Sequence, residues 1–254
     1  MADPVVIERR FHGPPDSGNG GYTCGLVAAA VRPDPALEVT LRLPPPLDRS
    51  LSREAADGGV ELRDGDALVA EGQPAPAPDP EIPRPVSLDD AEAARRDSPL
   101  HQHHPFPSCF VCGPERDPGD GMRVTCGPVP GREEELVAAP WETDEWMAAP
   151  DGAIREELVW AALDCPSGLA GMLVPGLGVT VLGRLTAMLP RQVDPGHTHV
   201  AIGWPIEREG RKLQTGSAVL DGAGKPLAWA RATWIELRDQ PPGAAGYGKA
   251  PGRS

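Results

Sequence analysis

The sequence predicts an α+β fold of two tandem units, in each of which a curved antiparallel sheet wraps around a central helix. Repeated features of the 254-residue chain support this prediction. Residues 61–73 and 219–232 share one pattern, an apolar strand, a turn containing Asp-Gly and a second apolar strand. Residues 38–44 and 181–190 are strands that contain an Arg and end on a Pro. Both strands follow an apolar stretch that opens on a Gly, at 20–31 and 152–173. The same unit therefore occurs twice.

In the first unit, an entry strand at 5–11 leads through a Gly- and Pro-rich loop to a short buried helix at 22–31. Four strands are expected to follow, near 37–43, 49–55, 59–64 and 67–73. Prolines dominate residues 74–85, which predicts an extended connector. Ser87 then offers an N-cap to a short polar helix at 91–96.

In the second unit, Ile154, Leu158 and Ala161 recur at helical spacing and predict a long helix at about 153–172. Strands are expected near 122–126, 133–140, 178–190, 197–206, 211–221 and 225–237. The predicted organisation is a unit at 1–75, a Pro-rich linker with a Cys-x-x-Cys segment at 76–118, a second unit at 119–240 and a disordered tail at 241–254.

Composition excludes several classes of protein. The formal net charge of −13 disfavours nucleic acids and anionic membrane surfaces as partners. No apolar run is long enough to span a bilayer, so membrane insertion is not expected. Five cysteines at scattered spacings predict reduced thiols in a cytoplasmic protein.

Several short motifs resemble those of one family. Phe11-His-Gly-Pro-Pro, followed by Asn19-Gly-Gly-Tyr at a helix start, resembles the first half of double hotdog acyl-CoA thioesterase-like proteins. Cys109-Phe-Val-Cys-Gly-Pro, Gly119-Asp-Gly-Met and Val159-Trp-Ala-Ala-Leu-Asp-Cys-Pro-Ser-Gly resemble an actinobacterial hotdog group. The resemblance implies a tandem hotdog whose site lies at the seam of the two halves. It also implies an acyl-CoA substrate, no cofactor and a homo-oligomer of pseudo-dimers.

Asp164 is the expected general base or nucleophile. It ends an otherwise apolar helical face, where a carboxylate needs a partner, and the family commonly uses an acidic residue on this helix. Alternatively, Pro166 interrupts the helix and Asp164 caps a new turn. Glu156 and Glu157, in the first turn, are interpreted as solvated residues or as residues favoured by the helix dipole.

Asn19, Gly20 and Gly21 are expected to complete the catalytic set. Their backbone N–H groups, at a helix N-terminus, could bind a developing oxyanion on the side of the thioester opposite Asp164. The alternative is structural, with an N-cap at Asn19 and glycines that permit close helix–sheet approach. Four residues are assigned to substrate binding, Tyr22, Trp160, Arg184 and Arg211, the two arginines as anchors for the coenzyme A phosphates.

The cysteines are expected to be structural. Cys109 and Cys112 are predicted to be free thiols with a packing role, without essential zinc, because one Cys-x-x-Cys pair supplies only two of four ligands. The alternative is a zinc site completed by His104 and Cys126. Cys24 and Cys165 are interpreted as small buried hydrophobic residues.

Three functions remain open from the sequence. The first is hydrolysis of an acyl-CoA or related acyl thioester, and the second is a non-catalytic protein that binds acyl groups in the same tunnel. The third, a hotdog hydratase or dehydratase, is disfavoured because the chain lacks an Asp-x-Asn-Pro-x-His segment.

Overall fold

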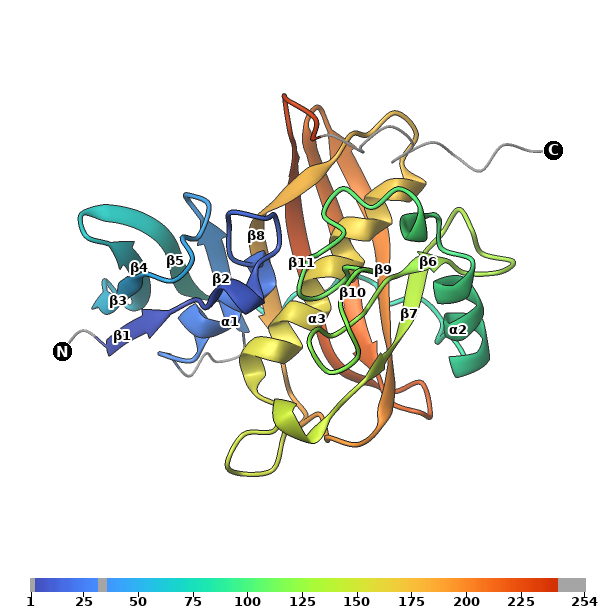
Figure 1. Ribbon diagram of the computed structural model, residues 1–254, viewed down its shortest axis with the longest axis horizontal. Coiled ribbons are helices and arrows are strands. Elements are labelled where there is room, and N and C mark those ends of the chain that lie inside the picture. Colours follow the sequence, from blue (N-terminus) through green and yellow to red (C-terminus); the bar gives the residue numbers. More distant parts are fainter. Residues whose placement is uncertain (1–2, 32–35, 242–254) are drawn as a thin grey trace.

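Eleven strands of the described part of the chain form one continuous sheet, which wraps around two helices. The computed structural model describes residues 3–31 and 36–241, so nearly all of the tail expected at 241–254 lies outside the described residues. The sheet order is β1-β3-β4-β5-β2-β8-β11-β10-β9-β7-β6 (Figure 1). All pairings between neighbouring strands are antiparallel, which confirms the predicted α+β class.

The first half of the sheet follows the predicted pattern closely. Its elements are β1 (Asp3–Val6), α1 (Gly20–Ala28), β2 (Ala36–Leu41), β3 (Ser50–Ala56), β4 (Gly59–Asp64) and β5 (Ala67–Ala75). The entry strand is shorter than expected, since a 3-10 turn occupies Arg9–Phe11. Helix α1 begins earlier than expected, directly after its N-cap Asn19.

The second half contains the longer helix and the longer strands. Its elements are β6 (Gly127–Pro128), β7 (Val137–Glu142), α3 (Glu156–Leu169), β8 (Thr180–Met188), β9 (Thr198–Glu209), β10 (Lys212–Leu220) and β11 (Pro226–Glu236). The strand expected near 122–126 is wrong. Arg123 has a φ of 55°, which interrupts an extended backbone, and Met122 and Val124 instead donate to the carbonyls of Phe110 and Val111.

The two halves join where β2 pairs with β8. Val39 lies opposite Leu185 and Leu37 opposite Ala187, and Val39, Leu185 and Leu37 are fully buried. Helices α1 and α3 contact each other on the inner face of this sheet, α1 against β2 and β5 and α3 against β8 to β11. On this inner face, buried apolar residues of both halves form one cluster. The seam is therefore part of a common core.

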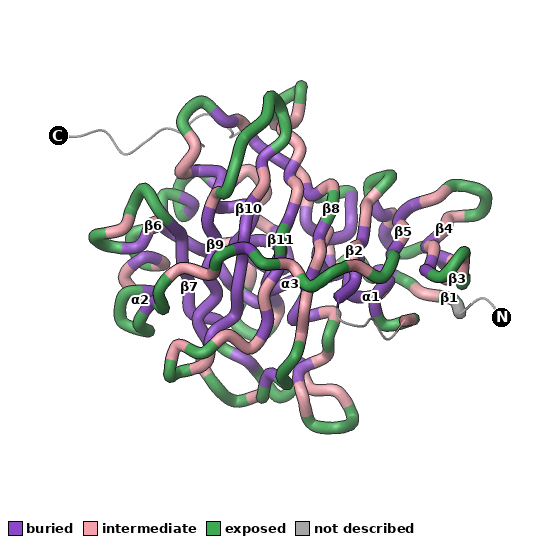
Figure 2. Tube along the Cα trace, turned by 180° about the vertical axis from the view of Figure 1, so that it is seen from behind, coloured by how far each residue is buried: buried purple, intermediate pink, exposed green. Residues whose placement is uncertain are grey.

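The Pro-rich connector crosses the outer face of the second half and leads to α2 (Leu88–Arg96), as Figure 2 shows from behind. Trp204 and Trp229 donate their indole N–H groups to the carbonyls of Pro80 and Pro78, at 3.1 and 3.0 Å. The predicted cap is present, because Ser87 accepts a hydrogen bond from the Asp90 N–H. The connector and α2 thus cover a small outer core that includes Val86, Ala91, Ala94, Ile202 and Trp204.

No helix among the described residues is long and apolar enough to cross a membrane.

Candidate active site

Asp164 joins the two helices at the centre of the molecule. Helix α3 continues through Pro166 to Leu169, so Asp164 does not cap a new turn. Its Oδ2 atom accepts hydrogen bonds from the Asn19 side-chain Nδ2–H, at 3.0 Å, and from the Gly21 backbone N–H, at 2.9 Å. The carboxylate of one helix therefore lies at the N-terminus of the other, where the helix dipole favours negative charge.

Asn19 has two roles in this arrangement. Its Oδ1 atom accepts from the Tyr22 N–H at 2.9 Å, which makes it the N-cap of α1. Because this bond fixes the amide plane, the Nδ2–H group is directed at Asp164. Asn19 is therefore both the N-cap of α1 and a hydrogen-bond donor to Asp164.

Gly21 is required by the close approach of the helices. A Cβ atom at this position would lie 2.3 Å from Asp164 Cβ and 2.6 Å from the Trp160 carbonyl oxygen. The absence of a side chain lets the Gly21 N–H reach the carboxylate. Gly20, one residue earlier, lines the adjacent cavity, and its N–H is the first of α1 and has no partner within the helix.

Burial dominates the electrostatics of Asp164. The side chain is 2% exposed, and its removal from water raises its pKa from 3.8 to about 7. The hydrogen bonds from Gly21 and Asn19 act in the opposite direction but only partly offset burial. The second carboxylate oxygen, Oδ1, is buried and has no hydrogen-bond partner. Only one of the two carboxylate oxygens of Asp164 is therefore held by protein donors.

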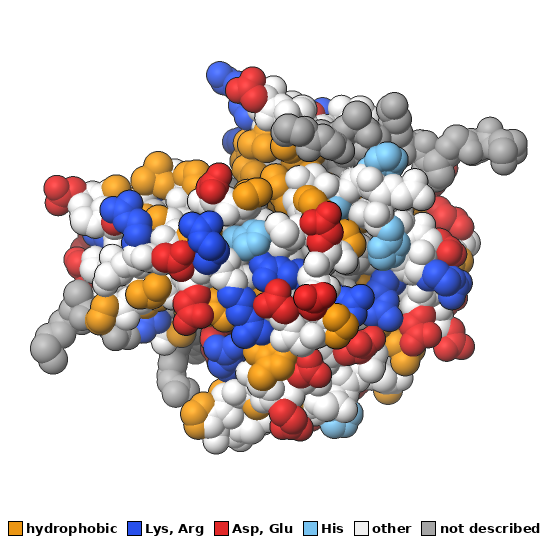
Figure 3. All heavy atoms as spheres, viewed as in Figure 1, with side chains coloured by type: hydrophobic (Ala, Val, Ile, Leu, Met, Phe, Trp, Pro, Cys, Tyr) orange, Lys and Arg blue, Asp and Glu red, His pale blue; other side chains and the backbone are white. Residues whose placement is uncertain are grey.

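Asp164, Asn19 and Gly20 line one cavity of about 540 Å³, within the range of small-molecule sites. Most of its wall is apolar and comes from both halves, including Leu41, Leu43, Leu169, Val181, Leu182 and Trp234. On the surface, hydrophobic side chains gather over the upper ends of β8 and β11, whereas acidic and basic groups are intermixed elsewhere on this face (Figure 3).

The Cys-x-x-Cys segment, residues 104–114, forms another wall of the cavity through His104, Phe106, Cys109 and Cys112. The Phe110 N–H donates to the His12 carbonyl at 2.8 Å, and the Phe110 ring packs edge-on against Phe11 at 4.9 Å between ring centres. This linker segment therefore belongs to the candidate site. The sequence did not indicate this, because the segment lies outside both predicted units.

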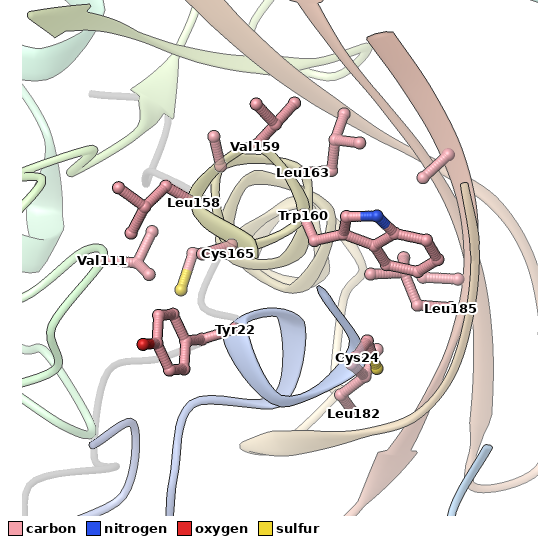
Figure 4. Packing of buried hydrophobic residues seen from close by; sticks show 14 of the residues in the cluster. Tyr22, Cys24, Val111, Leu158, Val159, Trp160, Leu163, Cys165, Leu182 and Leu185 are labelled. Carbon is pink, nitrogen blue, oxygen red and sulfur yellow. The ribbon is translucent and has the colours of Figure 1, made fainter. Parts of the chain in front are cut away.

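Tyr22 and Trp160, assigned to substrate binding from the sequence, lie in the core and do not line the cavity. Tyr22 stacks on Phe11 with 4.2 Å between ring centres. Trp160 points from α3 toward Leu185 of β8, on the other side of the helix from Cys165 (Figure 4). Burial raises the pKa of Tyr22 to about 12, so its hydroxyl stays protonated.

Arg184 and Arg211 also lie away from the cavity. Arg184 follows strand alternation to the outer face opposite Leu185, where it pairs with Glu38 at 3.2 Å beside a polar groove. Arg211 donates to the Glu236 carbonyl at 2.6 Å beyond β9. The arginine that does line the cavity is Arg42, which pairs with Glu71. The feature of the sequence that could have identified Arg42 is the Arg that each of the repeated strands contains.

Three of the five cysteines come together beside Asp164. The sulfur atoms of Cys109, Cys112 and Cys165 all lie within 4.8 Å of one another, and all three side chains are buried. Cys165 therefore joins the Cys-x-x-Cys pair, whereas Cys126 and His104, the ligands considered with this pair from the sequence, are not members of the group. Glu156 is exposed, as expected.

Comparisons with known proteins support the fold. No family model and no curated protein matches the chain. Among solved structures, the tesB protein of Mycobacterium avium subsp. paratuberculosis superposes with a TM-score of 0.57 at 12% identity, over 89% of each chain. A Thermobifida fusca protein described as a thioesterase II gives 0.57 at 15%, over 92% of each chain. A Novosphingobium aromaticivorans protein described as a thioesterase gives 0.58 at 11%, over 92% of this chain and 94% of that one.

The fold is a double hotdog. Each hotdog unit contributes one helix, α1 or α3, and the two sheets share the β2–β8 edge. The domain boundaries at 75, 118 and 240 remain a prediction. The described cavity lies at the seam, since residues of both hotdog units line it.

Proposed function

We propose that this double hotdog protein is a thioesterase-like hydrolase that cleaves an acyl thioester, of the acyl-CoA class, in the cavity at the seam. One observation carries the proposal. Asp164 lines an apolar cavity, its Oδ2 is held by two donors of the first unit, and its Oδ1 is buried without a hydrogen-bond partner. A carboxylate held in this way suits proton transfer, because its orientation is fixed and one oxygen is free.

In this mechanism Asp164 Oδ1 accepts a proton from water as the water oxygen attacks the thioester carbonyl. The carbon–sulfur bond then breaks, and the proton passes from Asp164 to the leaving thiolate. A carboxylic acid and a thiol are the products. The apolar wall excludes bulk water, which strengthens the electrostatic interactions of this step.

The donor set differs from the one that the sequence predicts. The Gly21 N–H already binds Asp164, and the Asn19 side chain is divided between Asp164 and Tyr22. These groups position the base and are not available to the substrate. We assign the carbonyl oxygen to the Gly20 N–H at the positive end of α1. This proposal takes base and donor from neighbouring positions around the start of α1, whereas the sequence prediction placed them on opposite sides of the thioester.

Different parts of the cavity suit the acyl chain and the coenzyme A portion of an acyl-CoA. Its apolar wall suits an acyl chain, and Arg42 at the same cavity provides a cation for coenzyme A phosphates. We assign the anchoring role to Arg42 because Arg184 and Arg211 do not line the cavity. A local cation is needed, since the net charge of −13 repels an anionic substrate. A cytoplasmic location and a homo-oligomer stay predictions.

The test is a thioester hydrolysis panel across acyl-CoA chain lengths, with thiol release as the readout. We expect Asp164→Asn to lower kcat/KM by about 10²- to 10⁴-fold for every responsive substrate, the usual effect of losing a general base. The matched control is Glu156→Gln, an exposed carboxylate on the same helix, which should leave the rate unchanged.

The possible outcomes separate the remaining functions. A rate for Asp164→Asn within about threefold of the parent would contradict the assignment, given the size of a general-base effect. Saturable acyl-CoA binding by the parent without hydrolysis would instead support a non-catalytic binding protein. Hydration of an enoyl-CoA without thiol release would support a hydratase.

A further inference from the structure

The sulfur group beside Asp164 has the spacing of a metal site. Cys109 Sγ lies 3.9 Å from Cys165 Sγ, and all three sulfur atoms lie within 4.8 Å of one another. A disulfide needs about 2.05 Å. Three thiolates about 2.3 Å from a tetrahedral Zn²⁺ are about 3.8 Å apart. The observed distances match the tetrahedral edge far better than a covalent sulfur pair.

Two distant parts of the chain supply the three sulfur atoms. Cys109 and Cys112 lie in a tight turn in which the Gly113 N–H donates to the Cys109 carbonyl at 2.9 Å. A Cβ at Gly113 would lie 2.5 Å from that carbonyl, so only glycine fits the turn. Cys165 points from α3 toward Val111, a residue that lies between Cys109 and Cys112 in the sequence (Figure 4). The Cys-x-x-Cys spacing is the usual one for structural zinc ligands.

His104 lines the same cavity as the three cysteines but is not a member of the sulfur group. Its Nδ1 accepts the Phe106 N–H at 2.9 Å, so the proton of the neutral ring is assigned to Nε2. Nε2 is buried and has no partner in the thiol form, and His104 lines the same cavity as the cysteines. A protonated nitrogen cannot ligate a cation, so His104 is not counted among the ligands.

We propose that Cys109, Cys112 and Cys165 bind one thiolate-preferring divalent cation, of which Zn²⁺ is the natural representative. Binding releases three thiol protons, and the three thiolates with M²⁺ carry a net charge of −1. The fourth position faces the cavity that all three cysteines line and is filled by water or a small ligand. This proposal replaces the sequence expectation of free packing thiols, and it does not depend on the proposed hydrolase activity.

The site would fasten the linker to helix α3. The Cys-x-x-Cys segment already bonds to both units, because the Phe110 N–H donates to the His12 carbonyl and the Met122 and Val124 N–H groups donate to the Phe110 and Val111 carbonyls. A metal bound to Cys165 would tie the same segment to α3. It would therefore fix the cavity wall that His104 and Phe106 form.

The experiment measures metal content and spectra of the full-length protein. We expect about one Zn²⁺ per chain by elemental analysis after expression in zinc-supplemented medium. After treatment with a chelator and reconstitution with Co²⁺, the protein should show the intense near-ultraviolet charge-transfer absorption of thiolate-bound cobalt. Cys109→Ala and Cys165→Ala should lose both signals. The matched control is Cys126→Ala, because Cys126 is equally buried but lies outside the group.

The cobalt spectrum of the unmodified protein makes the test independent of whether a variant folds. Failure of that protein to take up either ion would overturn the proposal, as would uptake that survives in Cys165→Ala. A thiol count below five in metal-free, unreduced, denatured protein would also overturn it, since it would show that the sulfur atoms form a disulfide.

Discussion

His199 in β9 shows how burial sets the behaviour of a single ionisable side chain. The ring is 5% exposed, and its Nδ1 atom is buried without a hydrogen-bond partner. Burial lowers its pKa below the ordinary 6.5, and the neighbouring His197 lowers it further. The Asp194 carbonyl and the more distant Asp221 carboxylate raise it, but less than burial lowers it. The folded protein therefore keeps His199 neutral at a pH where the unfolded chain protonates it.

This difference predicts a pH dependence of stability. Below about pH 6.5 the unfolded chain binds the His199 proton and the folded protein does not, so the free energy of unfolding falls as pH decreases toward the folded pKa. His199→Gln, which retains a donor for the Asp194 carbonyl, should make this decrease shallower in urea titrations between pH 5 and 7. The control His103→Gln, at an exposed position, should keep the parent slope. An unchanged slope in His199→Gln would contradict the prediction.

At the same scale, the sequence indicated some site residues and misassigned others. Asp164 could be found because a carboxylate on an apolar helical face must have a partner. Asn19 and Gly21 were assigned to the same site, but the bond between Gly21 and Asp164 could not be predicted, since a contact 143 residues apart leaves no local pattern. Tyr22 and Arg184 were misplaced because spacing alone does not tell which side of a helix or strand faces a cavity.

At the scale of elements, the packing of α1 on α3 depends on glycine. A Cβ at Gly25 would lie 2.3 Å from Glu157 Cα, which is backbone and cannot move away alone. We expect Gly25→Ala to separate the helices and lower the free energy of unfolding by about 1–3 kcal/mol or more, as overpacking does. Urea unfolding measures this, with Gly222→Ala as control because a Cβ there meets nothing within 4 Å. A Gly25→Ala protein as stable as the control would refute this packing argument.

Most strands could be predicted because alternating apolar residues and Asp-Gly turns are local signals. The strand near 122–126 could not, because its apolar residues pair with the Cys-x-x-Cys segment through an irregular backbone. Helix α3 was predicted as one long helix at about 153–172, and the interruption at Pro166 that was considered as an alternative does not occur. Tertiary packing on the sheet keeps the helix intact there, with Gly203 directly against the Pro166 carbonyl.

At the scale of the whole molecule, the shared sheet and common core predict that both hotdog units unfold together. All six tryptophans lie between residues 141 and 234, so their fluorescence reports the second unit, whereas far-ultraviolet circular dichroism reports both. We expect the two signals to give the same urea midpoint, because β2–β8 pairing and the α1–α3 contact couple the units. A circular dichroism change that precedes the fluorescence change would show that the first unit unfolds independently.

The tandem arrangement was predictable from the repeated strands and turns, because each copy carries its own signals. The joining edge and the path of the linker were not. Residues 104–114 belong to neither repeat, yet they contact α1 and α3 and line the cavity. Their position depends on long-range contacts that no single repeat encodes.

Helices α1 and α3 are not equivalent, so the two halves of the chain differ in what they contribute to the cavity. Asp164 is the ninth residue of α3, and the ninth and last residue of α1 is Ala28. The first turn of α3 has no side-chain cap, and Glu157 there packs on Gly25 where Asp164 packs on Gly21. A symmetric dimer of identical chains would carry two equivalent reaction centres. In a single chain the two positions can differ: under the proposed mechanism Asp164 serves the chemistry, and the matching position in α1 can serve packing alone.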